Sequence, residues 1–146
     1  MPRELITFEV EDQLFGLDVM AIREIRAWTP VTRLPGVPHY VAGVVNLRGS
    51  VLPVIDLAAR LGWPATEATA RHAIIVTQSG GQVRGLIVDS VSDIVAISDD
   101  AVQPPPAPSG DNVVGFLEGL VTHDERMIMV LDLKTLSADE AALEAA

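Results

Sequence analysis

Short runs in which apolar and polar residues alternate dominate the chain and predict an all-β fold. In ITFEV, residues 6–10, Ile6, Phe8 and Val10 fall on one face of an extended strand and the polar residues on the other. The runs AIIVT and VRGLIVD flank SGGQ, where Gly80 and Gly81 supply the positive φ angles of a tight turn. This pair of runs therefore predicts a β hairpin.

Two segments depart from the β pattern. SADEAALEAA, residues 137–146, places Ser137 and Glu140 at the spacing of a capping box, which predicts a C-terminal helix. PPPAPSGDN, residues 104–112, is rich in residues that interrupt regular structure and predicts a loop. The chain is therefore expected to be a β protein with short helices.

An internal repeat divides the chain into two similar halves. GLDVMAIREI (16–25) matches GLIVDSVSDI (85–94), and VAGVVNLRGSVLPVIDL (41–57) matches LEGLVTHDERMIMVLDL (117–133) without a gap. Units this small bury too little surface to be stable alone. We therefore expect a single domain over 1–146 in which two β units, about 16–66 and 67–137, share a core. An exchange of the N-terminal strand between the units is an alternative arrangement.

The two halves differ at one turn. Leu47-Arg48-Gly49 in the first half aligns with a turn of the second half whose sequence is His123-Asp124-Glu125. One turn carries a cation and the other carries acids, so the two turns cannot have the same role. Pro53 follows closely and has no N–H to donate, which predicts that its strand lies at an edge of the sheet or is bulged there.

Composition and charge exclude several classes of function. The net charge is −10 and the ten Lys and Arg residues are scattered, which argues against binding of nucleic acid or of an anionic membrane surface. Cysteine is absent, so disulfides, thiol catalysis and cysteine-ligated metals are excluded. No apolar run approaches the ~20 residues of a membrane-spanning helix, and the N-terminus lacks the apolar region of a signal peptide.

Candidate catalytic and metal-binding residues are few. His39, His72 and His123 have none of the spacings used by metal sites, so we expect neither a metal nor a cofactor. Asp56 and Asp132 end equivalent strands, and carboxylates at strand ends can pair in acid–base catalysis. Their equivalence in the repeat favours a simpler role, which is to cap the turn that follows each strand. No nucleophile or phosphate-binding motif is present, and nothing positive indicates an enzyme.

Three segments together resemble the CheW family of chemotaxis coupling proteins. They are GLDVMAIREI, PHYVAGVVNLRGSVLPVIDL and VRGLIVDSVSDI, which occur in the family's order, and the match extends over nearly the whole chain. The resemblance implies two packed SH3-like five-stranded β-barrels and a non-enzymatic adaptor. It also implies two partners, namely the cytoplasmic tip of chemoreceptors and the regulatory domain of the histidine kinase CheA. Such an adaptor is cytoplasmic and is recruited to the inner face of the membrane by receptors.

The resemblance also implies a set of partner-binding residues. Arg48 is the arginine of the NLRG motif, and Glu24 is the family's acidic residue before Ile25. We predict that Glu24 and Arg48 form a pair that holds the geometry between the two barrels. The further residues that match receptor- or kinase-contact positions of the family are Ile22 and Gly43 in the first barrel and Gly85, Val91 and Ile94 in the second.

Three hypotheses of function follow. The first is the chemotaxis adaptor, acting with its partners alone or also in rings with its own kind. The second is an adaptor of the same fold in another array-like pathway, such as surface motility or transcriptional control. The third, from a different class, is a small-molecule-binding barrel or enzyme with an acidic site. The first two differ only in their partners, whereas the third predicts binding of small molecules or turnover by the isolated protein.

Overall fold

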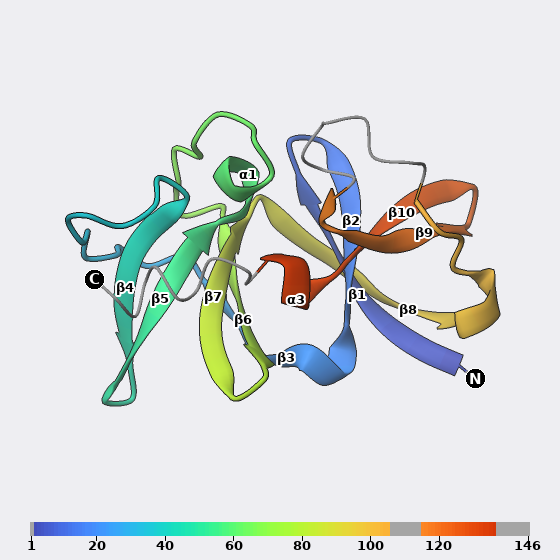
Figure 1. Cartoon of the computed structure of the whole chain (residues 1–146), viewed down its shortest axis with the longest axis horizontal. Coiled ribbons are helices and arrows are strands. Elements are labelled where there is room, and N and C mark those ends of the chain that lie inside the picture. Colours follow the sequence, from blue (N-terminus) through green and yellow to red (C-terminus); the bar gives the residue numbers. More distant parts are fainter. Residues whose placement is uncertain (1, 106–114, 137–146) are drawn as a thin grey trace.

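The computed structural model describes residues 2–105 and 115–136, and within these residues more than half lie in β-strands (Figure 1). The helical elements are short: the 3-10 turns Val19–Ala21 and Asp99–Ala101, and the helices α1 (Leu57–Arg60) and α3 (Leu133–Leu136). The strands are β1 Pro2–Val10, β2 Gln13–Asp18, β3 Ile22–Ala27, β4 Val41–Leu47, β5 Ser50–Asp56, β6 Ala73–Ser79, β7 Gln82–Val88, β8 Ser90–Ser98, β9 Leu117–His123 and β10 Arg126–Leu131.

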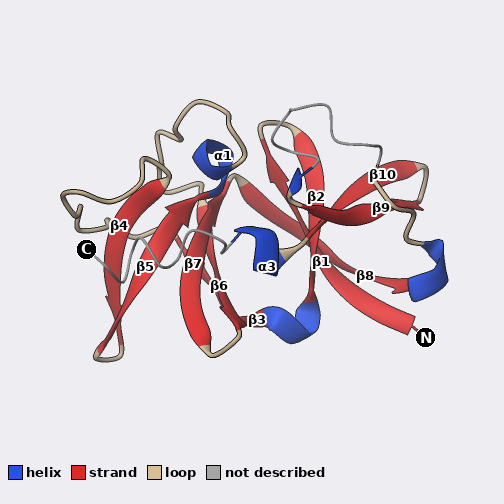
Figure 2. Ribbon diagram, in the orientation of Figure 1, coloured by secondary structure: helices blue, strands red, loops and turns tan. Residues whose placement is uncertain are grey.

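The strands form two five-stranded sheets, one for each barrel (Figure 2). The first barrel has the order β3-β6-β7-β5-β4, and the second has the order β8-β1-β2-β10-β9. The predicted fold class, all-β with two five-stranded units and short helices, is confirmed. Residues 137–146, where a C-terminal helix was predicted, and most of the predicted loop at 104–112 lie outside the described residues.

The predicted division into barrels at 16–66 and 67–137 is wrong at the level of strands. The hairpin β6–β7 belongs with β3–β5 in the first barrel, and the hairpin β1–β2 belongs with β8–β10 in the second. The repeat itself is present, because the two sheet orders correspond strand for strand. Each half of the chain places its first hairpin in one barrel and its next three strands in the other.

This exchange follows from two parallel strand pairings. Strand β5 pairs in parallel with β7 of the other half, and β10 pairs in parallel with β2. Parallel neighbours cannot be joined by a tight hairpin, so each pairing requires strands that are distant along the chain. Alternating polarity reveals which residues are strands, but it does not reveal these pairings.

Three apolar clusters stabilise the arrangement. One lies inside the first barrel around Val54 and Ile74, and one lies inside the second around Leu5 and Val130. The third and largest takes residues from both barrels and from α1 and α3, and its members include Phe8, Phe15, Val41, Ile55, Leu86, Val88, Leu131 and Leu136. The shared core predicted from the repeat is therefore present.

The hairpin turns are equivalent in the two halves. Each has two central residues with positive φ, namely Glu11 and Asp12, Arg48 and Gly49, Gly80 and Gly81, and Asp124 and Glu125. Strand β6 pairs with β7 as the sequence predicts, from Ala73 opposite Val88 to Ser79 opposite Gln82. The alignment of the Arg48 turn with the Asp124 turn is therefore confirmed.

Pro53 lies in β5, which is an inner strand of its sheet rather than an edge strand. It lies opposite Val44 of β4, while pairing of β5 with β7 starts only at Val54. On the β7 side, Pro53 thus precedes the paired part of the strand, and its missing N–H breaks no hydrogen bond of the β5–β7 pairing. The irregularity of the β4–β5 pairing lies between Val41 and Gly43, so the predicted bulge at Pro53 is not observed.

Candidate functional site

The predicted pair of Glu24 and Arg48 is present in the structure. Arg48 Nη1 donates to Glu24 Oε2 over 2.8 Å, and Nη2 donates to Oε1 over 3.3 Å. Arg26 Nη1 donates a further hydrogen bond of 3.1 Å to Glu24 Oε1. A guanidinium that binds both oxygens of a carboxylate is held in a defined orientation. The carboxylate of Glu24 therefore orders two cations on the surface of the first barrel.

The charge environment of Glu24 lowers its pKa. The hydrogen bond from Arg48 is the largest cause, and the hydrogen bond from Arg26 is the next. The side chain of Arg48 is 74% exposed whereas that of Glu24 is 24% exposed. The arginine thus presents most of its surface to a partner while the carboxylate fixes its position.

The pair lies at one end of the molecule, beside a groove. Arg48 comes from the turn that follows β4, and Glu24 comes from β3. Strands β3 and β4 are the two edge strands of the same sheet. The groove has a volume of about 440 Å³, and its other lining residues include Arg23, Val51, Pro53 and Val83. We call this surface, Glu24 and Arg48 with the groove, the first end. Figure 1 shows the β4–β5 hairpin and the β9–β10 hairpin at opposite ends of the long axis.

The equivalent surface of the second barrel has the opposite charge. Asp93 of β8 takes the place of Glu24, and Asp124 of the β9–β10 turn takes the place of Arg48. Both line a smaller groove of about 260 Å³ that also includes Ile94 and Arg126. Among the described residues, no cation forms an ion pair with Asp93, in contrast to its counterpart. We call this surface the second end.

The predicted role of the Glu24–Arg48 pair as a link between the barrels is wrong. Both residues belong to the first barrel, so their ion pair joins two edges of one sheet. Polar contacts between the barrels are made elsewhere, and one of them comes from Arg60 of α1, whose Nε donates to the carbonyl oxygen of Leu136 over 3.0 Å. The sequence motif identified the correct pair, but only the topology shows which surfaces the pair connects.

The remaining predicted site residues fall into two groups. Gly43 and Gly85 are buried. A Cβ on Gly43 would overlap the backbone of Thr32, and a Cβ on Gly85 would lie 2.7 Å from Cγ2 of Ile74. In this conformation neither glycine reaches the surface, and both permit close packing of their neighbours. Gly85 also lies in β7 of the first barrel, whereas the sequence predicted the second barrel.

Ile22, Val91 and Ile94 lie on edge strands. Ile22 and Val91, which are equivalent in the repeat, are partly buried against the core shared by the two barrels. Ile94 is 59% exposed on β8. The structure thus brings Glu24 and Arg48 together at the first end, leaves Ile94 at the second end, and places Ile22 and Val91 near the line where the barrels meet.

Sequence reasoning did not single out two exposed apolar residues, of which Val51 lines the first end and Met127 lines a separate groove beside Leu120 and Thr122. Val51 of β5 is 66% exposed, and its counterpart Met127 of β10 is 56% exposed. Both occupy strands that read as alternating β pattern, so the sequence alone does not show which face meets solvent. Their equivalence in the repeat was the available signal.

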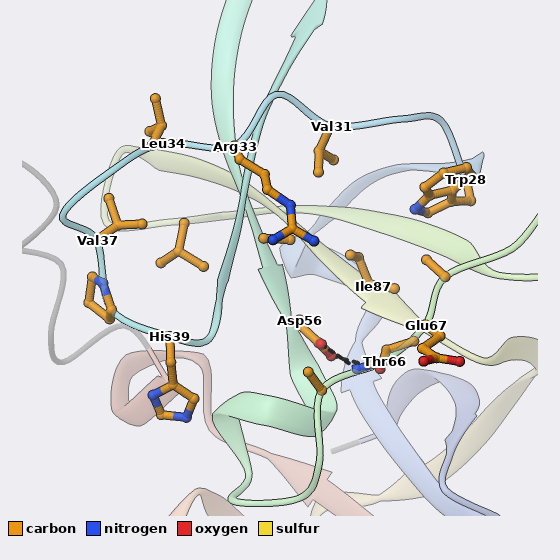
Figure 3. A pocket seen from close by; sticks show the side chains of 15 residues that line it. Trp28, Val31, Arg33, Leu34, Val37, His39, Asp56, Thr66, Glu67 and Ile87 are labelled. Carbon is orange, nitrogen blue, oxygen red and sulfur yellow. Dashed lines mark hydrogen bonds between the residues drawn. The ribbon is translucent and has the colours of Figure 1, made fainter.

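A further pocket in the first barrel bears on the hypothesis of an acidic active site. It has a volume of about 480 Å³, and Val31, Leu34 and Val37 lie along one side (Figure 3). Asp56 lines it, but its oxygens accept hydrogen bonds from Thr66 N at 2.6 Å and Thr66 Oγ1 at 2.8 Å. This carboxylate holds a loop in place.

The same aspartate confirms the predicted capping role. Asp56 is the N-cap of α1 and accepts a hydrogen bond from Ala59 N. Its counterpart Asp132 accepts hydrogen bonds from Lys134 N at 3.0 Å and Thr135 Oγ1 at 3.1 Å. The two carboxylates occupy equivalent structural positions.

These features define a class of protein. The described residues contain no group of three metal-ligating side chains, and no helix among them is both long and apolar enough to cross a membrane. What the molecule offers is two equivalent ends of opposite charge, each with an exposed apolar side chain, on a double barrel. This is the geometry of a scaffold for other proteins.

Comparisons with known proteins identify the family. The family model of the CheW-like domain matches the sequence of this chain over residues 4–141. The chain is 50% identical over 137 residues to a probable chemotaxis protein CheW of Rhizobium etli, covering 94% of this chain and 88% of that protein. It is 49% identical to chemotaxis protein CheW of Rhizobium meliloti, covering 94% and 89%. The scaffolding protein TtCheW from Thermoanaerobacter tengcongensis has a similar structure, with a TM-score of 0.84 at 33% identity, covering 93% of this chain and 88% of TtCheW.

The chain therefore belongs to the CheW-like family. Its members are chemotaxis scaffold proteins without enzymatic activity.

Proposed function

We propose that this protein couples the cytoplasmic tip of chemoreceptors to the histidine kinase CheA. The observation that carries the proposal is the first end, where Glu24 holds the exposed guanidinium of Arg48 beside a groove. Such an ordered cation flanked by apolar surface is typical of the central residues of protein interfaces. The coupling takes place at the inner face of the membrane, where the receptors hold the adaptor.

The charges of the two ends support end-to-end docking on a barrel of the same fold. Arg23, Arg26 and Arg48 surround the single carboxylate of Glu24 at the first end. Asp93 and Asp124 outnumber the one arginine, Arg126, that lines the second end. Surfaces of opposite charge attract, and surfaces of like charge disfavour the wrong pairing. The kinase's regulatory domain, which carries the same fold, would meet one end, and a second copy of this chain in a ring would meet the other.

The receptor tip would dock along the line where the barrels meet. Ile22 and Val91 lie at this line in equivalent positions and pack partly against the shared core. A helical hairpin that places apolar residues in an apolar groove uses a common mode of peptide recognition. Moderate affinity is sufficient there, because an array holds many copies close together.

Co-sedimentation with receptor membranes and kinase tests the proposal. Wild-type protein is expected to sediment with both partners, and Arg48→Glu is expected to lose kinase binding by about tenfold or more, because it places two carboxylates side by side. Arg71→Glu is the matched control, because this exposed arginine lies in the loop before β6, outside both ends.

Comparison of the wild type, Arg48→Glu and Arg71→Glu distinguishes a wrong function from a wrong contact surface. If wild-type protein sediments with neither partner, the coupling function is wrong. If Arg48→Glu binds as well as Arg71→Glu does, the coupling stands but the first end is not the contact.

A further inference from the structure

A single arginine lies where the two halves of the repeat meet. The gapless alignment of 41–57 with 117–133 extends to Tyr40 and Phe116, and to Arg60 and Leu136. The first pair are both aromatic, but the second pair differ in chemistry. Arg60 is the last residue of α1, and Leu136 is the last residue of α3. The repeat is thus asymmetric where the two helices meet.

The contacts of Arg60 reach both halves. Its guanidinium carbon lies 4.5 Å from the ring centroid of Tyr40 and 4.5 Å from that of Phe116. Its Nε donates to the carbonyl oxygen of Leu136 over 3.0 Å, and Nη2 donates to that of Thr135 over 3.4 Å. A planar cation between two rings, with its edge toward two carbonyls, is held in both orientation and position.

The asymmetry has a physical reason. The last carbonyls of a helix lack partners within the helix and attract a cation. Arg60 binds the carbonyl of its own counterpart, so a second arginine at 136 would bring two cations together at the same place. Leu136 instead has a side chain that is 2% exposed and packs in the shared core. The contact therefore combines one arginine, which binds the helix carbonyls, with one leucine, which packs in the shared core.

We propose that Arg60 is a positioning residue that fixes the angle between the two barrels. The shared core is apolar, and apolar contact has little directional preference, so it permits several relative orientations. Directional contacts come from Asp89, which accepts a hydrogen bond from Glu11 N over 2.9 Å and lies 3.5 Å from His72 Nε2, and from Arg60, whose hydrogen bonds and ring contacts join α1 to α3. Because the docking surfaces lie at opposite ends of the molecule, this angle sets their relative direction. The functional consequence rests on the coupling role proposed above, but the geometric role does not.

Distance measurements between spin labels test the geometric role. The chain contains no cysteine, so Val51→Cys and Met127→Cys place one label in each barrel at exposed positions. Double electron–electron resonance is measured on the double-cysteine protein with Arg60 intact, with Arg60→Leu, with Arg60→Lys and with Arg71→Leu as the control. The unlabelled Arg60 variants are tested for binding to receptor and kinase.

We expect Arg60→Leu to broaden the distance distribution by about twofold, because barrels that lose one of their directional links move more freely relative to one another. Arg60→Lys, which keeps the charge but loses the planar fork, should broaden it less. Receptor binding, which spans both barrels, should weaken more than kinase binding. An unchanged distribution in folded Arg60→Leu overturns the proposal, even if the melting temperature falls. Failure of wild-type protein to bind receptor leaves the distance result intact and rejects only the coupling role.

Discussion

At Glu24, two arginines lower the pKa of one partly buried carboxylate. The hydrogen bond from Arg48 lowers the pKa of Glu24, and Arg26 lowers it further. The ion pair is therefore fully formed above the ordinary range of a glutamate, and it is lost as the pH falls through the lowered pKa of the folded protein. At neutral pH the first end is ordered.

Arg48→Gln should raise the pKa of Glu24 toward its ordinary value, because the largest cause of the shift is removed. Arg26→Gln should raise it by less. The measurement is an NMR titration of the Glu24 side-chain carboxyl carbon. Identical titration curves in Arg48→Gln and wild type would show that the ion pair is not formed in solution.

Gly43 and Gly85 are both constrained by packing. We expect Gly85→Ala to cost about 1–3 kcal/mol, because its methyl group would meet the side chain of Ile74. Gly43→Ala should cost more, because the obstacle is the backbone of Thr32, which cannot rotate away. Urea unfolding measures both. Two variants of wild-type stability that fail to bind a partner would instead indicate contact roles.

At the scale of elements, α1 and α3 are short helices whose starts depend on aspartates. A helix of four residues has little stability of its own, so its cap and its tertiary packing must hold it. The sequence predicts both caps because VIDL and VLDL are equivalent. It does not predict that Asp56 also binds the loop that contains Thr66.

Asp56→Ala should therefore destabilise the protein more than Asp132→Ala. The first change removes a cap and leaves Thr66 without its buried acceptor, at a cost of about 2–4 kcal/mol. The second removes a more exposed cap, at a cost of about 1 kcal/mol. Thermal unfolding of both variants and of the double mutant gives the comparison, and equal losses would contradict the added role of Asp56.

At the scale of the whole molecule, the exchange of hairpins makes the two halves depend on each other. The first barrel lacks β6 and β7 without the second half, and the second barrel lacks β1 and β2 without the first. A cut in the loop between α1 and β6 therefore interrupts both barrels at once. Barrels made of contiguous segments would survive the same cut.

Fragments 1–68 and 69–146 are expected to be unfolded when separate and to recover the native fold when mixed. Far-UV circular dichroism and size-exclusion chromatography of each fragment and of the 1:1 mixture provide the measurement. Rapid folding of either fragment alone, with native sheet content, would contradict the exchange. Full-length protein with a protease site inserted in the same loop serves as the control, because its halves fold before the cut.

The sequence predicted the site as a pair of residues but not as a surface. Glu24 and Arg48 could be identified because both lie in motifs. The surfaces around them could not, because the exposure of apolar side chains such as Val51 depends on how each sheet closes into a barrel. Arg60 carried no motif, and its role depends on the contact between α1 and α3, which are 73 residues or more apart along the chain.

Local chemistry in the sequence by itself determined the strands, the hairpin turns, the two capping aspartates and the repeat. These depend on side-chain alternation, on turn residues and on hydrogen bonds between near neighbours, all of which involve residues close together along the chain. Only the tertiary structure decided which strands share a barrel, because the parallel pairings of β5 with β7 and of β10 with β2 join distant segments. For the same reason, only the structure showed that Arg48 serves one barrel and that Arg60 joins the two.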